Sequence, residues 1–193
     1  MTVPTVICAD QVIAQPWRNG GGRTRELLTR PAGGRDWQLR ISLAEVDREG
    51  PFSSFPGIER WFAVVAGTGV RLSIDGRERV LRPGDGPIRF SGEAPVSCAL
   101  LDGATTDLNL MHSVGTGCMQ LARPGVTWQS PMPNRGLFTW AGGRLQIGGS
   151  PALSLPPRTL LWLDEAGSAG WTFQIEAAGA AAPAFWLGFD TAS

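Results

Sequence analysis

The chain has 193 residues and no formal net charge, because 17 basic residues balance 17 acidic ones. The balanced charge gives no reason to expect a nucleic acid or an anionic membrane as a partner. Every basic residue is an arginine, so the sequence excludes a Schiff-base lysine and the lysine of a phosphate-binding P-loop.

The three cysteines, Cys8, Cys98 and Cys118, are odd in number and widely spaced, which predicts neither a disulfide framework nor a zinc motif. We expect buried free thiols in a reducing compartment. The first residues lack the order of a signal peptide, and no apolar run is long enough to span a membrane. The predicted location is therefore the cytoplasm.

In the first half of the chain, hydrophobicity follows the period of a β-strand. Apolar side chains alternate with polar ones at positions 37–43, which indicates a strand with one apolar face. The dipeptide Asp75-Gly76 predicts a tight hairpin turn. Alternation and short apolar runs together predict strands at 37–43, 61–65, 70–74, 79–81, 96–101 and 106–112.

The second half has a similar but weaker pattern. The alanine-rich stretch 177–184 is either a helical turn or a loop. Short strands separated by Gly and Pro turns are typical of a sandwich or barrel, so the predicted fold class is all-β. Strands are predicted at 138–140, 144–147, 159–163, 171–175 and 184–189. Five tryptophans are expected in the core or at a barrel interface: Trp61, Trp140, Trp162, Trp171 and Trp186.

Two segments resemble the motifs of the cupin superfamily. The segment 59–69, ERWFAVVAGTG, is similar to the middle of the first motif, and 81–90, LRPGDGPIRF, is similar to the Pro-Gly-Asp turn of the second. Metal-binding cupins carry His-x-His before the glutamate and another histidine after the turn. Here the only histidine is His112, on an apolar strand face, where a structural role is expected. The sequence thus predicts no metal and no cofactor, and a barrel interior filled by side chains or left as an organic-ligand pocket.

The most unusual local sequence is WRNGGGRTRE, residues 17–26. It matches neither the P-loop nor the dinucleotide-binding pattern. Clustered glycines favour a simple turn between two strands, with Thr24 and Glu26 at the start of the next strand. The flanking Trp17, Asn19, Thr24 and Glu26 instead supply an aromatic wall, an amide and two oxygen groups, which suit a small polar ligand.

Three ordered motifs resemble the HutD/Ves family: WRNGGGRTRE at 17–26, FSSFPGIER at 52–60 and DLNLM at 107–111. The resemblance implies a bicupin in which two jelly-roll barrels pack as one unit. The first barrel would span about 17–115, and the second about 116–193 together with the N-terminal segment. Glu59 occupies a position that the family often gives to aspartate, so its role is open.

The same resemblance implies no established enzymatic activity. HutD proteins accompany histidine degradation, where they are thought to bind an intermediate such as urocanate or formylglutamate and to restrain flux. Ves-type relatives are linked to cold or stress responses. The sequence does not decide between these two branches.

Individual strand positions are consistent with a pocket. Arg40 and Ser42 lie on the polar face of the strand at 37–43, which faces either solvent or the barrel lumen. If that face lines the lumen, Arg40 is the best candidate to bind a ligand carboxylate through two parallel hydrogen bonds. Glu59 and Arg60 are adjacent and must face opposite sides of their strand, so at most one of them faces the lumen.

On the strand at 106–112, Asp107, Asn109 and Met111 share one face, which is either a ligand wall or a solvated exterior. Phe55 and Phe90 are predicted either as apolar pocket walls or as core residues. The predicted ligand site comprises Trp17, Asn19, Gly20, Gly21, Thr24, Glu26, Arg40, Ser42, Phe55, Glu59, Arg60, Phe90, Asp107, Asn109 and Met111.

The leading hypothesis is a non-enzymatic regulator that binds a small anionic or zwitterionic metabolite. The second is a metal-free isomerase or hydrolase that uses Glu26, Glu59 or Asp107 as acid or base. Two carboxylates facing each other across a pocket would favour that reading. The third is an assembly module that binds another protein. The sequence leaves open whether the protein forms a homodimer.

Overall fold

The computed structural model describes residues 3–33, 36–176 and 182–191. The chain divides into two compact units, Val12–Val114 and a second unit formed by Met1–Gln11 with Gly115–Ser193. Within the described residues, the elements are β-strands apart from one short 3-10 helix, η1 (Ala9–Gln11). No helix in this part of the chain is long and apolar enough to cross a membrane.

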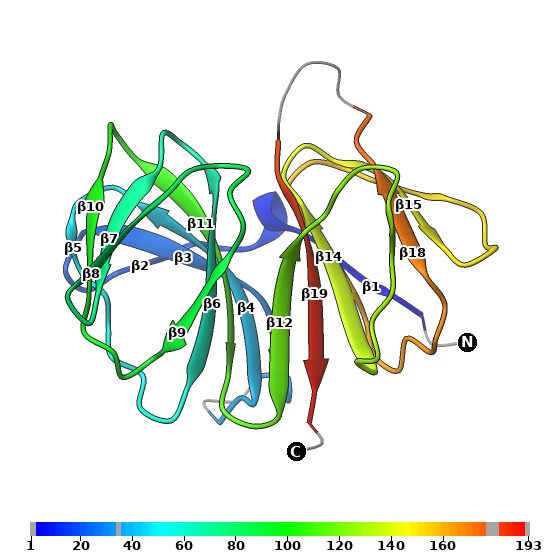
Figure 1. Ribbon diagram of the computed structural model, residues 1–193, viewed down its shortest axis with the longest axis horizontal. Coiled ribbons are helices and arrows are strands. Elements are labelled where there is room, and N and C mark those ends of the chain that lie inside the picture. Colours follow the sequence, from blue (N-terminus) through cyan, green and yellow to red (C-terminus); the bar gives the residue numbers. More distant parts are fainter. Residues whose placement is uncertain (1–2, 34–35, 177–181, 192–193) are drawn as a thin grey trace. The chain divides into compact units, whose positions relative to one another are not determined.

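The unit Val12–Val114 contains two antiparallel sheets (Figure 1). One has the order β2-β3-β4-β11-β6-β9 and the other the order β5-β10-β7-β8. The first sheet consists of β2 (Gln15–Pro16), β3 (Gly22–Arg30), β4 (Leu39–Val46), β6 (Glu59–Ala66), β9 (Ile88–Ser91) and β11 (Thr105–His112). The second consists of β5 (Gly50–Pro51), β7 (Val70–Ile74), β8 (Arg77–Leu81) and β10 (Val96–Leu100).

An apolar core joins these two sheets. Phe62 and Val64 of β6 pack in one buried cluster with Leu72 of β7 and with Val96 and Cys98 of β10. Burial of these side chains excludes water from the space between the sheets and is the main stabilising term for this unit. The sheets therefore form the two walls of a β-sandwich that can enclose a cavity.

The second unit repeats the arrangement with sheets of order β1-β17-β14-β19-β12 and β13-β18-β15-β16. The strands of the first are β1 (Thr5–Cys8), β12 (Thr116–Leu121), β14 (Asn134–Thr139), β17 (Thr159–Leu163) and β19 (Ala184–Asp190). Those of the second are β13 (Thr127–Trp128), β15 (Gly143–Ile147), β16 (Leu153–Leu155) and β18 (Trp171–Gln174).

Three tryptophans fill the space between the sheets of the second unit. Trp128 stacks on Trp186 with the ring centroids 5.1 Å apart, and Trp171 meets both rings edge-on. The buried Arg135 lies against Trp171 and donates hydrogen bonds to the carbonyls of Ala166 and Ala169 in the loop after β17. Bulky side chains thus occupy the interior of this barrel.

The predicted strands of both halves are confirmed, with shifts of a few residues at their ends. The segment predicted at 37–43 forms β4 two residues later, and the segment predicted at 138–140 belongs to a strand that begins at Asn134. Asp75 and Gly76 both have positive φ, 49° and 76°, as the predicted hairpin turn requires. The alanine-rich stretch 177–184 lies largely outside the described residues.

Several strands were not predicted, because apolar and polar residues do not alternate regularly in their sequences. The strand β12, TGCMQL, has only three apolar residues, and its burial comes from pairing with β19. Of the five tryptophans expected in the core or at a barrel interface, two are only half-buried: Trp61 lies under Arg89 and Trp140 under Arg158. Of the three free cysteines, Cys98 is buried, whereas Cys8 and Cys118 are half-buried.

Candidate ligand-binding site

A cavity of about 470 Å³ lies within the unit Val12–Val114. Its walls come from the faces of β3, β4, β6 and β11, from the segment before β3 and from the segment around β5. The lining residues are Gln15, Pro16, Trp17, Arg18, Asn19, Thr24, Arg40, Ser42, Ala44, Val46, Pro51, Phe52, Ser53, Phe55, Arg60, Phe62, Asp107, Asn109 and Met111.

Strand register explains why the polar side chains of the cavity meet. The strand β11 lies between β4 and β6, which run on either side of it (Figure 1). Met111 pairs with Arg40 on one side and with Arg60 on the other. Paired residues point to the same face of a sheet, so both arginines face the cavity, with the thioether of Met111 between their strand positions.

Arg60 is a buried cation at the wall of the cavity. Its side chain is only 7% exposed, and its guanidinium lies 5.1 to 5.7 Å from the ring centroids of Phe52, Phe55 and Phe90. One terminal nitrogen, Nη2, donates a hydrogen bond of 3.0 Å to Oδ1 of Asn109, while Nε has no hydrogen-bond partner. Burial, and then the charge of Arg40, lower the pKa of Arg60 to about 10.

The two arginines differ in how their charges are compensated. The Nε of Arg40 donates a hydrogen bond of 2.9 Å to the carboxylate of Glu26, and its Nη1 lies 3.8 Å from the sulfur of Met111. Arg60 forms no ion pair with any carboxylate of the described residues. Of these two arginines, the one whose charge lacks a counter-charge is therefore Arg60; the third arginine of the lining, Arg18, is exposed.

Asp107 is a second buried ionisable group in the same wall. The side chain is fully buried, and Oδ2 accepts only a long hydrogen bond, 3.4 Å, from Oγ1 of Thr105. The other oxygen, Oδ1, has no partner. Burial raises the pKa of Asp107 to about 8, against the smaller opposing effect of Thr105, so the carboxyl group is mostly protonated at neutral pH.

The glycine-rich motif forms the turn between β2 and β3 and the start of β3, and four of its side chains line the cavity: Trp17, Arg18, Asn19 and Thr24. The indole nitrogen of Trp17 donates a hydrogen bond of 2.7 Å to Oγ1 of Thr24, and Oδ1 of Asn19 accepts one of 3.0 Å from the amide of Gly21. A Cβ atom added to Gly22 would clash with the carbonyl oxygen of Glu45. The glycines thus allow close backbone approach, while Trp17 and Asn19 line the cavity.

The structure brings ten of the fifteen predicted site residues to the cavity: Trp17, Asn19, Thr24, Arg40, Ser42, Phe55, Arg60, Asp107, Asn109 and Met111. It leaves five outside the lining: Gly20, Gly21, Glu26, Glu59 and Phe90.

The side chains of three of these five residues make other contacts in the structure. Glu26 reaches the site only through Arg40, and Phe90 only through its ring contact with Arg60. Glu59 points to the opposite face of β6, where its carboxylate lies 3.2 Å from Nε2 of His112 and 3.7 Å from Arg89. The predicted structural role of His112 fits this buried contact.

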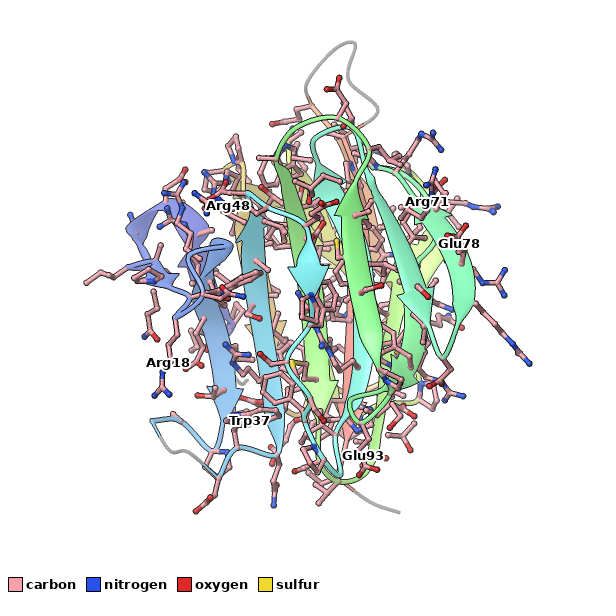
Figure 2. All side chains as sticks on the ribbon, turned by 90° about the vertical axis from the view of Figure 1, so that its left-hand side faces the viewer. Arg18, Trp37, Arg48, Arg71, Glu78 and Glu93 are labelled. Carbon is pink, nitrogen blue, oxygen red and sulfur yellow. The ribbon has the colours of Figure 1, made fainter. Side chains whose placement is uncertain are left out.

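Nine lining residues were not predicted: Gln15, Pro16, Arg18, Ala44, Val46, Pro51, Phe52, Ser53 and Phe62. A signal was present for several of them, because Ala44 and Val46 continue the face of Ser42, and Phe62 continues that of Arg60. Arg18 projects from the loop between β2 and β3 (Figure 2). No group of three or more His, Cys, Asp or Glu side chains in the described ranges is arranged to hold a metal ion.

The pair of two-sheet units defines an all-β protein of the cupin fold. Bacillus subtilis oxalate decarboxylase superposes with a TM-score of 0.64 over 100% of this chain and 79% of that structure; at 10% identity this likeness concerns the fold alone. The chain belongs to the HutD family, whose model matches residues 9–182. The predicted all-β bicupin fold and the predicted family are thus confirmed.

Two curated relatives match about half of the chain. An uncharacterized 21.2 kDa protein in the hutC 3′ region of Pseudomonas putida is 46% identical over 103 residues, which cover 51% of this chain and 52% of that protein. Protein Ves of Citrobacter koseri is 37% identical over 97 residues, or 49% of this chain and 50% of that protein. The chain therefore spans about half the length of the curated relatives it matches.

Two solved structures resemble the whole chain. A conserved protein of unknown function from Pseudomonas aeruginosa PAO1 has a TM-score of 0.86 and 29% identity, over 98% of this chain and all of that one. HutD from Pseudomonas fluorescens SBW25, solved in a formate condition, has a TM-score of 0.81 and 26% identity, over 99% of this chain and all of that one.

Proposed function

We propose that the cavity of the unit Val12–Val114 binds a small carboxylate without transforming it. The observation that carries this proposal is the buried guanidinium of Arg60, which faces the cavity and has no carboxylate partner in the described part of the chain. Burying an ion without a counter-charge costs on the order of several kcal/mol. A ligand carboxylate placed against Arg60 would offset that cost through charge-assisted hydrogen bonds.

The remaining walls suit an organic ligand of a few carbon atoms. A volume of about 470 Å³ falls within the range of small-molecule pockets, about 300–1,000 Å³. Trp17, Phe52 and Phe55 supply aromatic surface, and Ser42 and Asn109 supply neutral polar groups. Mostly apolar walls with a few polar groups are typical of sites that orient a small metabolite.

The relatives suggest the metabolic setting. One relative is named for its position in the hutC 3′ region, and another is HutD itself. We therefore propose a cytoplasmic regulator of histidine utilisation whose ligand is a pathway carboxylate such as urocanate or formylglutamate. Identity is higher to the Pseudomonas putida protein, 46%, than to Protein Ves, 37%, which favours this branch over a role in cold or stress responses.

The arrangement of carboxyl groups supports binding rather than acid–base catalysis. Of the described residues that line the cavity, Asp107 is the one with a carboxyl group. Glu59 faces the other side of the sheet, and Glu26 is paired to Arg40 outside the lining. A pair of facing carboxylates, as an acid and a base would require, is therefore missing from the described cavity wall.

Isothermal titration calorimetry with urocanate, formylglutamate and butyrate tests the proposal. The variant Arg60→Met removes the charge and keeps an unbranched apolar chain, whereas Arg71→Met is a matched control because Arg71 is exposed and outside the lining (Figure 2). We expect saturable binding by the wild type and by Arg71→Met, and at least a hundredfold loss in Arg60→Met. Absence of saturable binding of all three acids, or equal affinities in the three proteins, would refute the proposal.

A further inference from the structure

The cavity wall contains a polar atom that no described residue satisfies. Asp107 is fully buried and lines the cavity, yet Oδ1 lacks a partner and Oδ2 has only the long contact with Thr105. A buried polar group without a hydrogen bond costs about 1–3 kcal/mol. A ligand group that satisfies Asp107 would remove this cost, so the residue adds to the selection of the ligand.

Asp107 lies on the same face of β11 as Asn109, the hydrogen-bond partner of Arg60. Asn109, which accepts the hydrogen bond from Arg60, is two residues after Asp107 on β11. Residues two apart on a strand are separated by about 7 Å and point the same way. A ligand whose carboxylate meets Arg60 can therefore reach Asp107 with a second polar group three or four bonds further along its chain.

The groups around Asp107 decide what it can do. Its register neighbours are Ala44 on β4 and Val64 on β6, which carry no charge. On the opposite sheet, Cys98 of β10 is a neutral thiol, since burial and then Asp107 raise its pKa to about 12. Neither of the buried or half-buried arginines of the lining pairs with Asp107, because Arg60 donates to the neutral amide of Asn109 and Arg40 donates to Glu26.

Among the described residues, the one side-chain contact of the Asp107 carboxyl group is the long hydrogen bond from Thr105, and no ion pair is formed. Burial raises the pKa of this carboxyl group to about 8. In the neutral form, a carboxyl group has one O–H donor in addition to its acceptor sites.

We propose that Asp107 is a second recognition group of the cavity, whose O–H donates a hydrogen bond to an uncharged acceptor on the ligand. The ligand class is then a short carboxylate with a neutral carbonyl, such as an amide, at its far end. This inference rests on the proposed carboxylate-binding function and refines it. An amino acid with a distal ammonium group would instead require an ionised Asp107, and the two ligand classes can be separated directly.

The affinities of three small acids of similar length test this role of Asp107. Succinamate has a carboxylate and a neutral amide, 4-aminobutyrate has a carboxylate and an ammonium group, and butyrate has a carboxylate and a methyl group. With wild-type protein at pH 6.5, calorimetry should show succinamate binding about three- to tenfold more tightly than butyrate, as one hydrogen bond predicts. Equal affinities for these two acids, or a preference for 4-aminobutyrate, would overturn the inference.

The pH dependence gives an independent readout. Between pH 6.5 and pH 9.0 the protonated fraction of a group with pKa about 8 falls about tenfold, so the preference for succinamate should disappear. In Asp107→Asn, whose amide donates at every pH, the preference should persist at both values. A wild-type preference that is unchanged at pH 9.0, or one that falls equally in Asp107→Asn, would contradict the role of the Asp107 proton.

Butyrate separates this inference from the function on which it rests. Both the carboxylate site and the role of Asp107 would be supported by two results together. Arg60→Met should abolish butyrate binding, whereas Asp107→Ala should retain butyrate binding and lose the preference for succinamate. Butyrate binding with no such preference in any of the proteins would leave the carboxylate site standing and reject the role of Asp107. Failure of all three acids to bind would reject both.

Discussion

Replacement of Arg60 by methionine should abolish carboxylate binding without destabilising the fold. When one partner of a buried ion pair is removed, the protein typically loses about 3–5 kcal/mol of stability, because the other charge stays buried without a partner. Arg60 has no carboxylate partner among the described residues, and its removal leaves only the neutral amide of Asn109. The methionine side chain can occupy the space between Phe52 and Phe55.

The magnitude follows from the opposing terms at this site. Burial, and then the charge of Arg40, lower the pKa of Arg60 to about 10, which corresponds to about 3 kcal/mol of unfavourable free energy for the charged form. Arg60→Met also loses the hydrogen bond to Asn109 and the contacts with the aromatic rings, which offsets about 2 kcal/mol of the free energy gained by removing the buried charge. We therefore expect Arg60→Met to gain about 1 kcal/mol in the free energy of unfolding.

Thermal unfolding with and without ligand measures both consequences. For a domain of this size, 1 kcal/mol corresponds to a rise of about 2–4 °C in Tm. Butyrate at saturating concentration should raise the Tm of the wild type and of the Arg71→Met control, but not that of Arg60→Met. A loss of more than 3 kcal/mol in Arg60→Met would refute the idea that this arginine is an uncompensated charge, and a Tm that still rises with butyrate would refute its role as the anchor.

Three further substitutions test the surroundings. Because the pKa of Asp107 is raised in the folded state, folding takes up a proton, and wild-type stability should fall as the pH rises from about 4 to about 8. Denaturant titrations of Asp107→Asn should lack this fall and give up to about 4 kcal/mol more stability at pH 7; parallel pH profiles of the two proteins would contradict it. Gly22→Ala places a Cβ against the carbonyl of Glu45 and should cost about 1–3 kcal/mol, measured by the same titrations; a neutral effect would mean that the turn relaxes freely. Glu26→Gln removes the counter-charge of Arg40, and calorimetry should show severalfold tighter butyrate binding with little change in Tm, since Glu26 is 46% exposed. Weaker binding in that variant would show that Glu26 is needed to position Arg40.

Local sequence was sufficient for much of the fold and for part of the site. The period of two placed Asp107, Asn109 and Met111 on one face and separated Glu59 from Arg60, and both patterns hold in the structure. Turn chemistry predicted the hairpin at Asp75-Gly76, where both residues have positive φ. These features depend only on covalent geometry and on neighbours close in sequence, so periodicity reveals them.

The chemistry of the site was decided by contacts between strands. From the sequence, Arg40 was the favoured carboxylate anchor, but in the structure its Nε is held by Glu26 from the adjacent strand β3. Arg60 instead enters a buried space closed by Phe52 and Phe55, where no carboxylate of the described residues pairs with its charge.

The sequence by itself determined the all-β class, the family and the set of polar side chains available to the cavity. It could not determine which arginine keeps a free charge or that the Asp107 carboxyl is held neutral, because both depend on strand register and burial. Register and burial arise from residues far apart in the chain: Arg60 and Asn109, which form the anchor, are 49 positions apart. Desolvation, which sets the charge state of both groups, exists only once the two sheets have closed around the cavity.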